Sequence, residues 1–296
     1  MNQITKGIGV VGSTTIDQIV TRNQRYRKLG GVTTYAGITY RRHGIPALVV
    51  SNLAKRDLKI LDQLKAEKLD VFAKTTEWTT HFVNDIRGQR RHQALPQQAA
   101  PISAGQIRAV VDRVDGLHLG PLHPLDIDPA AINLLREWNR WVFLDVQGYT
   151  RTVQNQKIYP SVSERLTAGL QAARVVKANG VEYRSVLDFY RMDLAQLLHR
   201  YKIEEFVVTW GEKGGFVQTP GGEIFRYAAQ SAASAVDPTG AGDVFFAAYI
   251  VSRFSHQMPI PDACRCAARI AAQQVEGKYI TRNQLDLESE SDTGAV

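Results

Sequence analysis

The chain has 296 residues, and 44% of them are hydrophobic, enough for one large core or for a core with a small appendage. The net charge of +7 comes from dispersed lysines and arginines, so we interpret it as tolerance for an anionic ligand rather than as a nucleic-acid surface. The longest apolar run near the N-terminus, residues 8–12, is too short for a signal peptide or a membrane span.

Cysteine usage indicates a reducing environment. Cys264 and Cys266 stand two positions apart in a helical pattern and therefore point to different faces of a helix, so neither a disulfide nor a shared metal ion is expected. We predict buried thiols and a cytoplasmic location.

Residues 8–20 predict a strand, a turn of small residues and a second strand. Gly7, Gly9 and Gly12 form the pattern G-x-G-x-x-G, which in dinucleotide-binding folds follows a strand and opens a helix. Here the glycines lie within the strand and a strand-like segment follows. A nicotinamide or flavin enzyme is therefore only a third hypothesis, and a thermal-shift comparison of ATP with NAD tests it.

The next segments alternate between helix and strand. Gly30 and Gly31 precede a helix that we expect to end at Gly44, and such paired glycines let a substrate lie against the backbone. Residues 46–54 and 70–76 predict strands on either side of a helix at 57–69, which favours a parallel sheet.

Residues 78–95 alternate like a β-hairpin, and together with residues 16–28 they are expected to form a small sheet beside the main domain. Four basic side chains cluster on this hairpin: Arg87, Arg90, Arg91 and His92. Two interpretations stay open, a solvated face or a contact with an anionic substrate or the transferring phosphate.

The second half continues the alternation, with helices expected at 106–111, 129–140 and 262–276 and strands at 116–120, 141–146, 174–178 and 205–210. His118 and His123 have no third ligand nearby, so we interpret them as structural. Asn179 and Glu182 follow a strand; their oxygens suit Mg²⁺, and the alternative is a helix N-cap.

The most informative stretch is residues 237–243, Asp-Pro-Thr-Gly-Ala-Gly-Asp, followed by a helix that is apolar almost all round. The amides that begin such a helix form an anion site. Asp243 lies in the first turn, where the helix dipole should keep it ionised. Amides that hold a phosphate and a carboxylate that takes a hydroxyl proton are what phosphoryl transfer needs. The alternative is a capped helix after a tight turn.

This stretch resembles the C-terminal signature of the ribokinase-like (PfkB) carbohydrate kinases, usually written D-T-x-G-A-G-D. The resemblance implies that Asp243 is the catalytic base and that the amides of Gly240, Ala241, Gly242 and Asp243 form the anion hole. It covers nearly the whole chain, with its motifs in the family's order.

On the acceptor side, Gly12 and Asp17 match the family's first glycine and its substrate-binding Asp. Gly30 and Gly31 match part of the G-G-x-G-x-N signature. Tyr35 stands where Asn is usual, which implies either an aromatic contact to the substrate or core packing of the helix.

On the donor side, Asn179 and Glu182 resemble the N-x-x-E motif that orders Mg²⁺ and its waters. Thr209, Gly211 and Gly214 resemble the nucleotide loop T-x-G-x-x-G, for which a plain hairpin turn is the alternative. The small residues of the helix at 262–276 imply the base pocket, and Gly242 is expected to contact the nucleotide as well.

We therefore expect one ribokinase-like domain over residues 1–296, with a doubly wound, mostly parallel α/β sheet, helices on both faces and a small β lid. The lid segments are about 16–28 and 76–96, and the tail at about 285–296 is expected to be disordered. A homodimer through the lid is one option that the sequence leaves open.

The leading hypothesis is a Mg²⁺- and ATP-dependent kinase that phosphorylates a hydroxyl of a sugar, polyol or nucleoside, with no nucleic-acid or membrane partner. A catalytically silent binding or regulatory protein on the same scaffold is the alternative. Asp17 suits a vicinal diol. Together with Tyr35 and a short lid, Asp17 slightly favours a ring-bearing acceptor, which is a nucleoside or a cyclic polyol.

Overall fold

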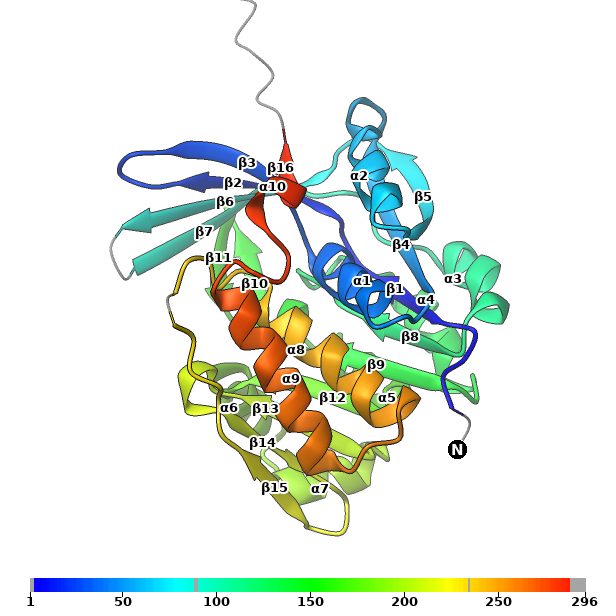
Figure 1. The fold of residues 1–296 in the computed structure, drawn as a ribbon. Coiled ribbons are helices and arrows are strands. Elements are labelled where there is room, and N and C mark those ends of the chain that lie inside the picture. Colours follow the sequence, from blue (N-terminus) through cyan, green and yellow to red (C-terminus); the bar gives the residue numbers. More distant parts are fainter. Residues whose placement is uncertain (1–2, 88–89, 234, 288–296) are drawn as a thin grey trace, which may run out of the picture.

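Two sheets organise the part of the chain that the computed structural model describes, residues 3–87, 90–233 and 235–287. The main sheet has the strand order β15-β14-β13-β12-β9-β8-β1-β4-β5 in this part (Figure 1). Its strands are β1 (Ile8–Val11), β4 (Ala47–Ala54), β5 (Asp70–Thr76), β8 (Gly116–Leu119), β9 (Trp141–Asp145), β12 (Val175–Asn179), β13 (Glu205–Thr209), β14 (Gly215–Gln218) and β15 (Ile224–Tyr227). The strands from β13 to β5 run parallel, whereas β14 and β15 are antiparallel.

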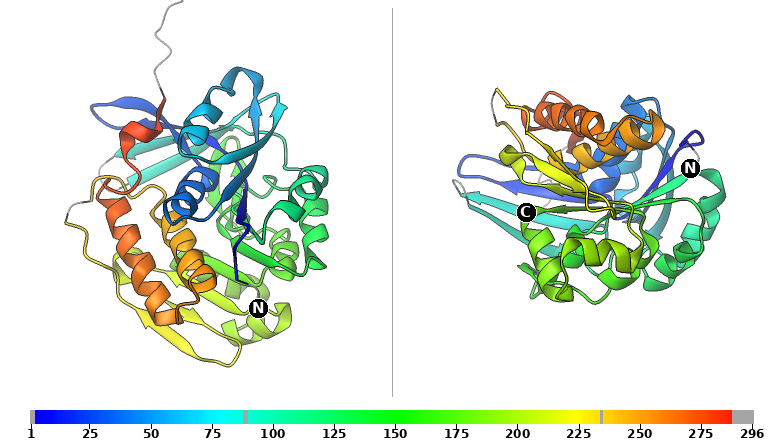
Figure 2. Two further views of the ribbon diagram at one scale, coloured as in Figure 1. Left: turned by 45° about the vertical axis from the view of Figure 1, so that its right-hand side comes forward. Right: turned by 90° about the horizontal axis from the view of Figure 1, so that it is seen from below.

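Helices cover both faces of the main sheet (Figure 2). One face carries α1 (Val32–Arg42), α8 (Ala241–Ile250) and α9 (Ile260–Val275). The other carries α3 (Ala104–Val110), α4 (Pro129–Asn133), α5 (Leu166–Ala172), α6 (Gly180–Tyr190) and α7 (Leu194–Tyr201). Alternate residues of β4 enter the two cores: Val49 packs in the first, and Leu48 and Val50 in the second. This is the continuous apolar pattern of a parallel strand that is buried on both faces.

The connections reverse direction between β1 and β8. From β1 the chain builds β4 and β5 toward one edge, and it later returns to place β8, β9, β12 and β13 on the other side. In open α/β sheets, ligands bind beyond the carboxyl ends of the strands at such a switch point. Asp145, Asn179 and Thr209, the last residues of their strands, all lie at this edge.

The second sheet has the order β10-β11-β7-β6-β2-β3-β16. Its strands are β2 (Thr15–Val20), β3 (Arg25–Gly30), β6 (Thr80–Arg87), β7 (Arg90–Gln97), β10 (Arg151–Gln154), β11 (Lys157–Pro160) and β16 (Asp286–Leu287). It contains both segments that the sequence placed beside the main domain. The hairpin β10–β11 lies at one edge of this sheet and the strand β16 at the other. Neither was predicted from the sequence.

The element types agree with the sequence-based expectations, and the α/β fold with helices on both faces is confirmed. Three details differ. The expected helix at 129–140 divides into α4 and a 3₁₀ turn at Leu134–Arg136. A 3₁₀ turn at Lys55–Asp57 precedes α2 (Ile60–Ala66). Cys264 is buried as expected, whereas Cys266 is partly exposed.

The prediction that the tail is disordered from residue 285 is wrong for its first three residues. Leu285 ends α10 (Arg282–Leu285) and is buried, and Asp286 and Leu287 form β16, which pairs with β3. Residues 288–296 lie outside the described part. No helix in the described part is long and apolar enough to cross a membrane.

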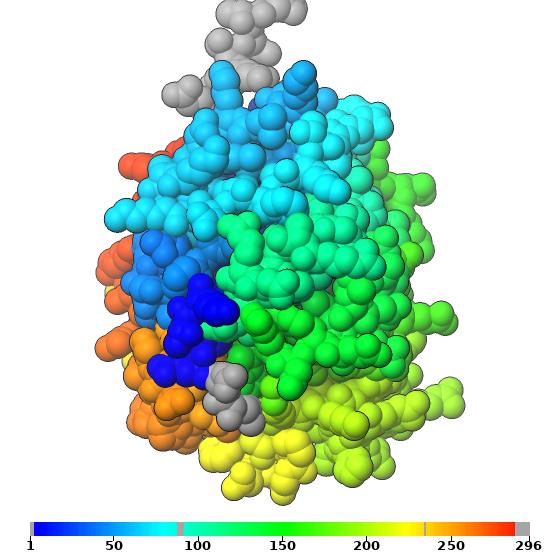
Figure 3. Space-filling view, turned by 90° about the vertical axis from the view of Figure 1, so that its right-hand side faces the viewer, coloured from blue at the N-terminus to red at the C-terminus, as the bar shows by residue number. Residues whose placement is uncertain are grey.

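The N-terminal segment joins two distant parts of the chain. Thr5 N donates to Asp115 Oδ2 at 2.7 Å, before β8, and Gln3 Nε2 donates to the carbonyl of Ser255 at 2.7 Å, after α8. Figure 3 shows this segment in dark blue between an orange surface and a green surface. Gly12 is followed by the strand β2 and not by a helix, so the glycine pattern lacks the context of a dinucleotide site.

Candidate active site

The turn before α8 approaches the core so closely that only glycine fits at its apex. Gly240 has φ 76°, and a Cβ there would lie 2.3 Å from a ring carbon of Tyr35. Helix α8 is buried from Val244 to Ile250, as the sequence predicted. The first intrahelical bond runs from Val244 N to the Gly240 carbonyl at 2.8 Å. The amides of Gly242 and Asp243 precede that bond and have no partner within the helix.

The amide of Ala241 differs from those two, because it donates to the carbonyl of Pro238 at 3.2 Å within the turn. The sequence placed this amide in the anion hole together with its neighbours. The geometry makes Gly242 and Asp243 the amides best placed to receive an anion.

Asp243 is half-buried in a cluster of charged side chains from four other elements. Burial and the Asp145 and Glu182 carboxylates raise the pKa of Asp243, whereas Lys177 and Arg151 lower it, and the net result is a pKa of about 7. The expectation that the helix dipole keeps Asp243 fully ionised is therefore wrong near neutral pH, because desolvation outweighs the dipole. A carboxylate with a pKa near the working pH is well suited to act as a general base.

Lys177 and Asp145 form a buried ion pair beneath this turn. Lys177 Nζ donates to Asp145 Oδ2 at 2.8 Å, and the two side chains are 6% and 1% exposed. The carboxylates around Lys177 raise its pKa despite its burial. Neither residue was singled out from the sequence, although a lysine inside the apolar strand β12 is a usable signal.

Asn179 and Glu182 form a capping box at the start of α6, the alternative that the sequence left open. Asn179 Oδ1 accepts from Glu182 N at 3.0 Å, and Glu182 Oε2 accepts from Asn179 N at 2.7 Å. Burial raises the pKa of Glu182, and its carboxylate shares the electrostatic environment of Lys177 and Asp145. The cap fixes the Glu182 carboxylate beside this charged cluster.

A pocket of about 840 Å³ opens beside residues 237–243, which we call the anion turn. Its lining includes Gly242 of the turn, and small residues from α9 form one part of its wall. Three further predicted nucleotide residues also line it: Thr209, Gly211 and Gly214. The role of Gly214 is partly local, since a Cβ there would lie 2.1 Å from the Tyr227 carbonyl across the β14–β15 hairpin.

Asp17 of β2 and Gly30 of β3 lie against each other. A Cβ on Gly30 would lie 2.5 Å from Asp17 Oδ2, and Thr15 Oγ1 donates to Asp17 Oδ1 at 2.7 Å. Strand β3 is tied to the anion turn, because buried Lys28 pairs with Asp237. Burial favours a higher pKa for Asp237, but Lys28 holds it below its usual value.

Tyr35 lies in the core and is 1% exposed, with its ring against the backbone of Gly240. The structure therefore favours the packing alternative for Tyr35 over a direct contact with substrate. Gly31 is close to the Ser13 carbonyl, where a Cβ would lie 2.2 Å away. The paired glycines thus seat the start of α1 on the loop between β1 and β2.

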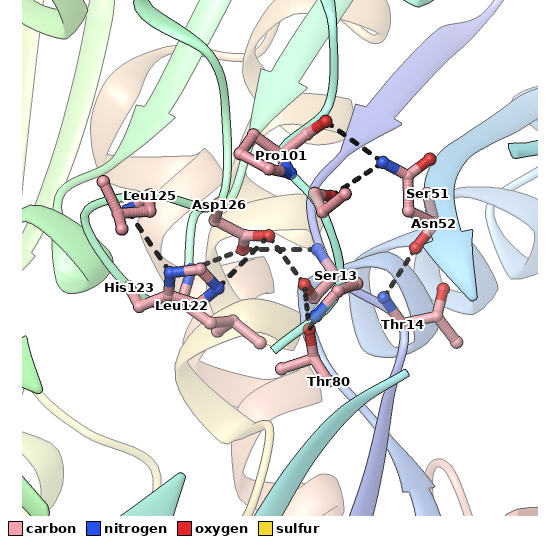
Figure 4. Close-up of polar contacts among 12 residues, drawn as sticks. Ser13, Thr14, Ser51, Asn52, Thr80, Pro101, Leu122, His123, Leu125 and Asp126 are labelled. Carbon is pink, nitrogen blue, oxygen red and sulfur yellow. Dashed lines mark hydrogen bonds and ion pairs between the residues drawn. The ribbon is translucent and has the colours of Figure 1, made fainter. Parts of the chain in front are cut away.

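The buried carboxylate of Asp126 fixes the loop between β1 and β2 (Figure 4). Asp126 accepts from Ser13 Oγ at 2.6 Å and from Leu122 N at 2.8 Å, and Ser13 Oγ is 2.8 Å from Thr80 Oγ1 at the start of β6. The network joins the carboxyl ends of β1 and β8 to the second sheet. It holds the segment that carries Asp17 in place.

A second pocket, of about 320 Å³, lies between the loop after β8 and strand β10. Its lining is mixed, and its polar residues include His123, Arg151, Ser161 and Ser163. Burial lowers the pKa of His123, and its Nε2 has no hydrogen-bond partner among the described residues. The charge of Arg151 acts on both His123 and Asp243.

The basic cluster of the β6–β7 hairpin is only partly described. Arg87 is exposed and pairs with Asp85 at 2.9 Å, which favours the solvated-face interpretation for this residue. His92 is exposed as well. The side chains of Arg90 and Arg91 lie outside the description.

Comparison with known families decides the classification. Residues 40–285 match the family described as pfkB family carbohydrate kinase. The chain belongs to this family. No curated protein matches it in sequence.

Solved structures of ribokinase-family members share the fold of this pfkB-family chain. A pyrophosphate-dependent kinase complexed with a pyrophosphate analogue and myo-inositol has a TM-score of 0.78 at 20% identity, over 90% of this chain and 94% of that one. A nucleoside kinase of Burkholderia thailandensis in complex with inosine has 0.75 at 18%, over 94% and 95%. A ribokinase from Thermotoga maritima has 0.71 at 16%, over 94% and 97%.

Proposed function

We propose that the chain is a kinase that transfers the γ-phosphate of ATP to a hydroxyl of a ring-bearing polyol. The observation that carries the proposal is the environment of Asp243: a carboxylate with a pKa of about 7 beside two helix amides. Asp17 and the large pocket beside Gly242 supply an acceptor side and a donor side.

Each group then has a defined task. Asp17 holds two hydroxyls of the acceptor and directs a third toward Asp243. Asp243 takes the proton of that hydroxyl as its oxygen bonds to the γ-phosphorus and the bond to the β-phosphate oxygen breaks, which releases ADP. The amides of Gly242 and Asp243 stabilise the charge on the moving phosphoryl group.

The charges around the turn fit a divalent cation. Asp145, Glu182 and Asp243 outnumber the cations Lys177 and Arg151 that act on Asp243. The described residues contain no cluster of three or more ligands that could enclose a metal ion. Mg²⁺ retains waters and needs few protein ligands beside phosphate. Glu182 and Asn179 would therefore hold it through water, and it would neutralise charge on the donor phosphates.

Removing the charge of Glu182 tests the metal assignment. We expect Glu182→Gln to raise the Mg²⁺ concentration needed for half-maximal turnover more than it raises the KM of the acceptor, because a neutral amide attracts the hydrated ion less strongly. Because an amide oxygen can still accept the cap hydrogen bond, the fold should be retained. An unchanged Mg²⁺ titration would leave Asn179 and Glu182 as a helix cap alone.

The large pocket favours ATP over pyrophosphate as donor. Pyrophosphate needs only the anion turn, whereas about 840 Å³ beside Gly242, walled by Ala268, Ala271 and Ala272, accommodates a nucleoside. One structurally similar kinase is pyrophosphate-dependent, so turnover with the two donors should be compared. Turnover with ATP should exceed turnover with pyrophosphate under identical conditions, and the reverse order would contradict the donor assignment.

The second pocket suits a hydroxyl-rich part of the acceptor. Arg151, Ser161 and Ser163 offer hydrogen-bond donors, and the charge of Arg151 acts on Asp243. Because Tyr35 lies in the core, the preference for a ring-bearing acceptor rests on these polar groups. They favour a cyclic polyol over a nucleoside.

One panel tests the function as a whole. ADP release is measured with ribose, fructose, 2-keto-3-deoxygluconate, adenosine, inosine, cytidine and myo-inositol as acceptors. Turnover with a cyclic polyol and its loss in Asp17→Ala, with ATP binding intact, would support the proposal. A higher kcat/KM for ribose or fructose would overturn the acceptor preference. ATP binding without turnover on any acceptor would favour a silent regulatory protein.

A further inference from the structure

Lys177 is a buried cation that lies against the turn before α8. A Cβ on Gly242 would lie 3.2 Å from Lys177 Nζ, so the ammonium faces the backbone of the anion turn directly. Gly242 also lines the donor pocket. The ammonium of Lys177 therefore lies against a residue that lines this pocket, and the amide of that residue has no partner within α8.

The contact with Asp145 uses one of the three hydrogen-bond donors of the Lys177 ammonium. An ammonium has three donors in different directions, and Asp145 Oδ2 accepts one of them at 2.8 Å. Asp145 is itself fixed, because its Oδ1 accepts from Gln147 N at 3.0 Å. The pair thus presents a cation from a rigid support at the carboxyl ends of β9 and β12.

We propose that Lys177 is a catalytic residue that holds the transferred phosphoryl group against the amides of Gly242 and Asp243, and that Asp145 is its positioning residue. The inference rests on the proposed function and assigns to this site a group that the sequence motifs did not include. In the transfer, negative charge lies on the equatorial oxygens of the phosphoryl group. A fixed ammonium in a desolvated site stabilises that charge without reorganisation.

A purely structural ion pair is the competing explanation. Removing one partner of a buried pair is strongly destabilising, because a charge is left uncompensated, whereas replacing both partners can be neutral. Lys177→Met alone therefore cannot separate the two explanations. The double variant Lys177→Met with Asp145→Asn can, since it removes both charges and the asparagine keeps an acceptor for Gln147 N.

The experiment combines anion binding, kinetics and thermal unfolding of the full chain. We expect the double variant to retain cooperative unfolding, to bind inorganic pyrophosphate at least ten-fold more weakly than wild type, and to lose roughly a hundred-fold or more in kcat. The KM of the acceptor should change little. Lys177→Arg, which keeps the charge, should recover part of kcat. Asp145→Asn alone should lower kcat less than the double variant does.

A second ion pair, between buried Glu205 and partly exposed Arg253, provides the control. Glu205 accepts from Arg253 Nε at 2.8 Å beside the far end of α8, and its side chain is 5% exposed. Glu205→Gln should lower thermal stability and leave kcat near wild type.

Three outcomes would overturn the inference. Wild-type pyrophosphate affinity and kcat in a folded double variant would make the pair structural, with the kinase assignment intact. A loss of kcat in Glu205→Gln as large as in the double variant would show that any lost ion pair has this effect. Absence of both ATP and pyrophosphate binding in wild type would remove the proposed function and this inference together.

Discussion

Replacing Asp243 with asparagine should lower kcat by about a hundred- to ten-thousand-fold and leave the affinity for the phosphate donor unchanged. The substitution removes the proton acceptor while it keeps the size of the side chain and the amides of the turn. Initial rates of ADP release at saturating acceptor give kcat, and a direct titration with ATP gives the affinity. A kcat within a few-fold of wild type would mean that Asp243 is not the base.

The stability of the same variant provides a control with a definite sign. The pKa of Asp243 is raised in the folded chain, so the folded state binds more protons than the unfolded state between about pH 4 and pH 7. The destabilisation from ionising this carboxylate is therefore absent at low pH and complete above about pH 7. Asp243→Asn should be at least as stable as wild type at pH 8, so a lost kcat cannot be attributed to unfolding.

The wild-type pH profile should show the base directly. Because Asp243 must be deprotonated to accept the hydroxyl proton, kcat/KM should fall about ten-fold per pH unit below an apparent pKa of about 7. This decrease in kcat/KM reports a pKa of the free enzyme. It should be absent from any residual activity of Asp243→Asn. A flat kcat/KM from pH 8 to pH 5 would contradict the raised pKa or the role of this carboxylate.

The sequence predicted those parts of the fold and site that depend on short segments. The alternation of strands and helices, the buried helix after residues 237–243 and the place of Asp243 in its first turn follow from local composition. The capping alternative at Asn179 and the packing alternative at Tyr35 were also visible locally. Choosing between them needed neighbours that are distant in the chain.

Interactions across the sequence account for what was missed. Lys177 and Asp145 are 32 positions apart and meet only because β9 and β12 are adjacent. Strand β16 pairs with β3 although the tail is rich in acidic and polar residues, a composition that suggests disorder. The pKa of Asp243 could not be predicted from the helix dipole, because its largest cause is burial and its second is Asp145.

Gly240→Ala should be the most destabilising single substitution in the anion turn. The left-handed backbone, with φ 76°, costs a residue with a side chain about 1–2 kcal/mol. The new methyl group would also lie 2.3 Å from the Tyr35 ring, and such overpacking typically adds about 1–3 kcal/mol. Thermal and denaturant unfolding should therefore show a loss of about 2–5 kcal/mol. Because the turn must shift, kcat should fall as well.

Gly222 separates the two causes of that loss. It has nearly the same backbone, φ 83°, but a Cβ there would have no atom within 4 Å. Gly222→Ala should therefore show only the backbone cost of about 1–2 kcal/mol, with wild-type kcat. Combining Gly240→Ala with Tyr35→Leu should cost less than the sum of the single variants, because the smaller side chain makes room for the methyl group. Equal losses in the two glycine variants, or strict additivity with Tyr35→Leu, would mean that the Tyr35 ring does not constrain the anion turn.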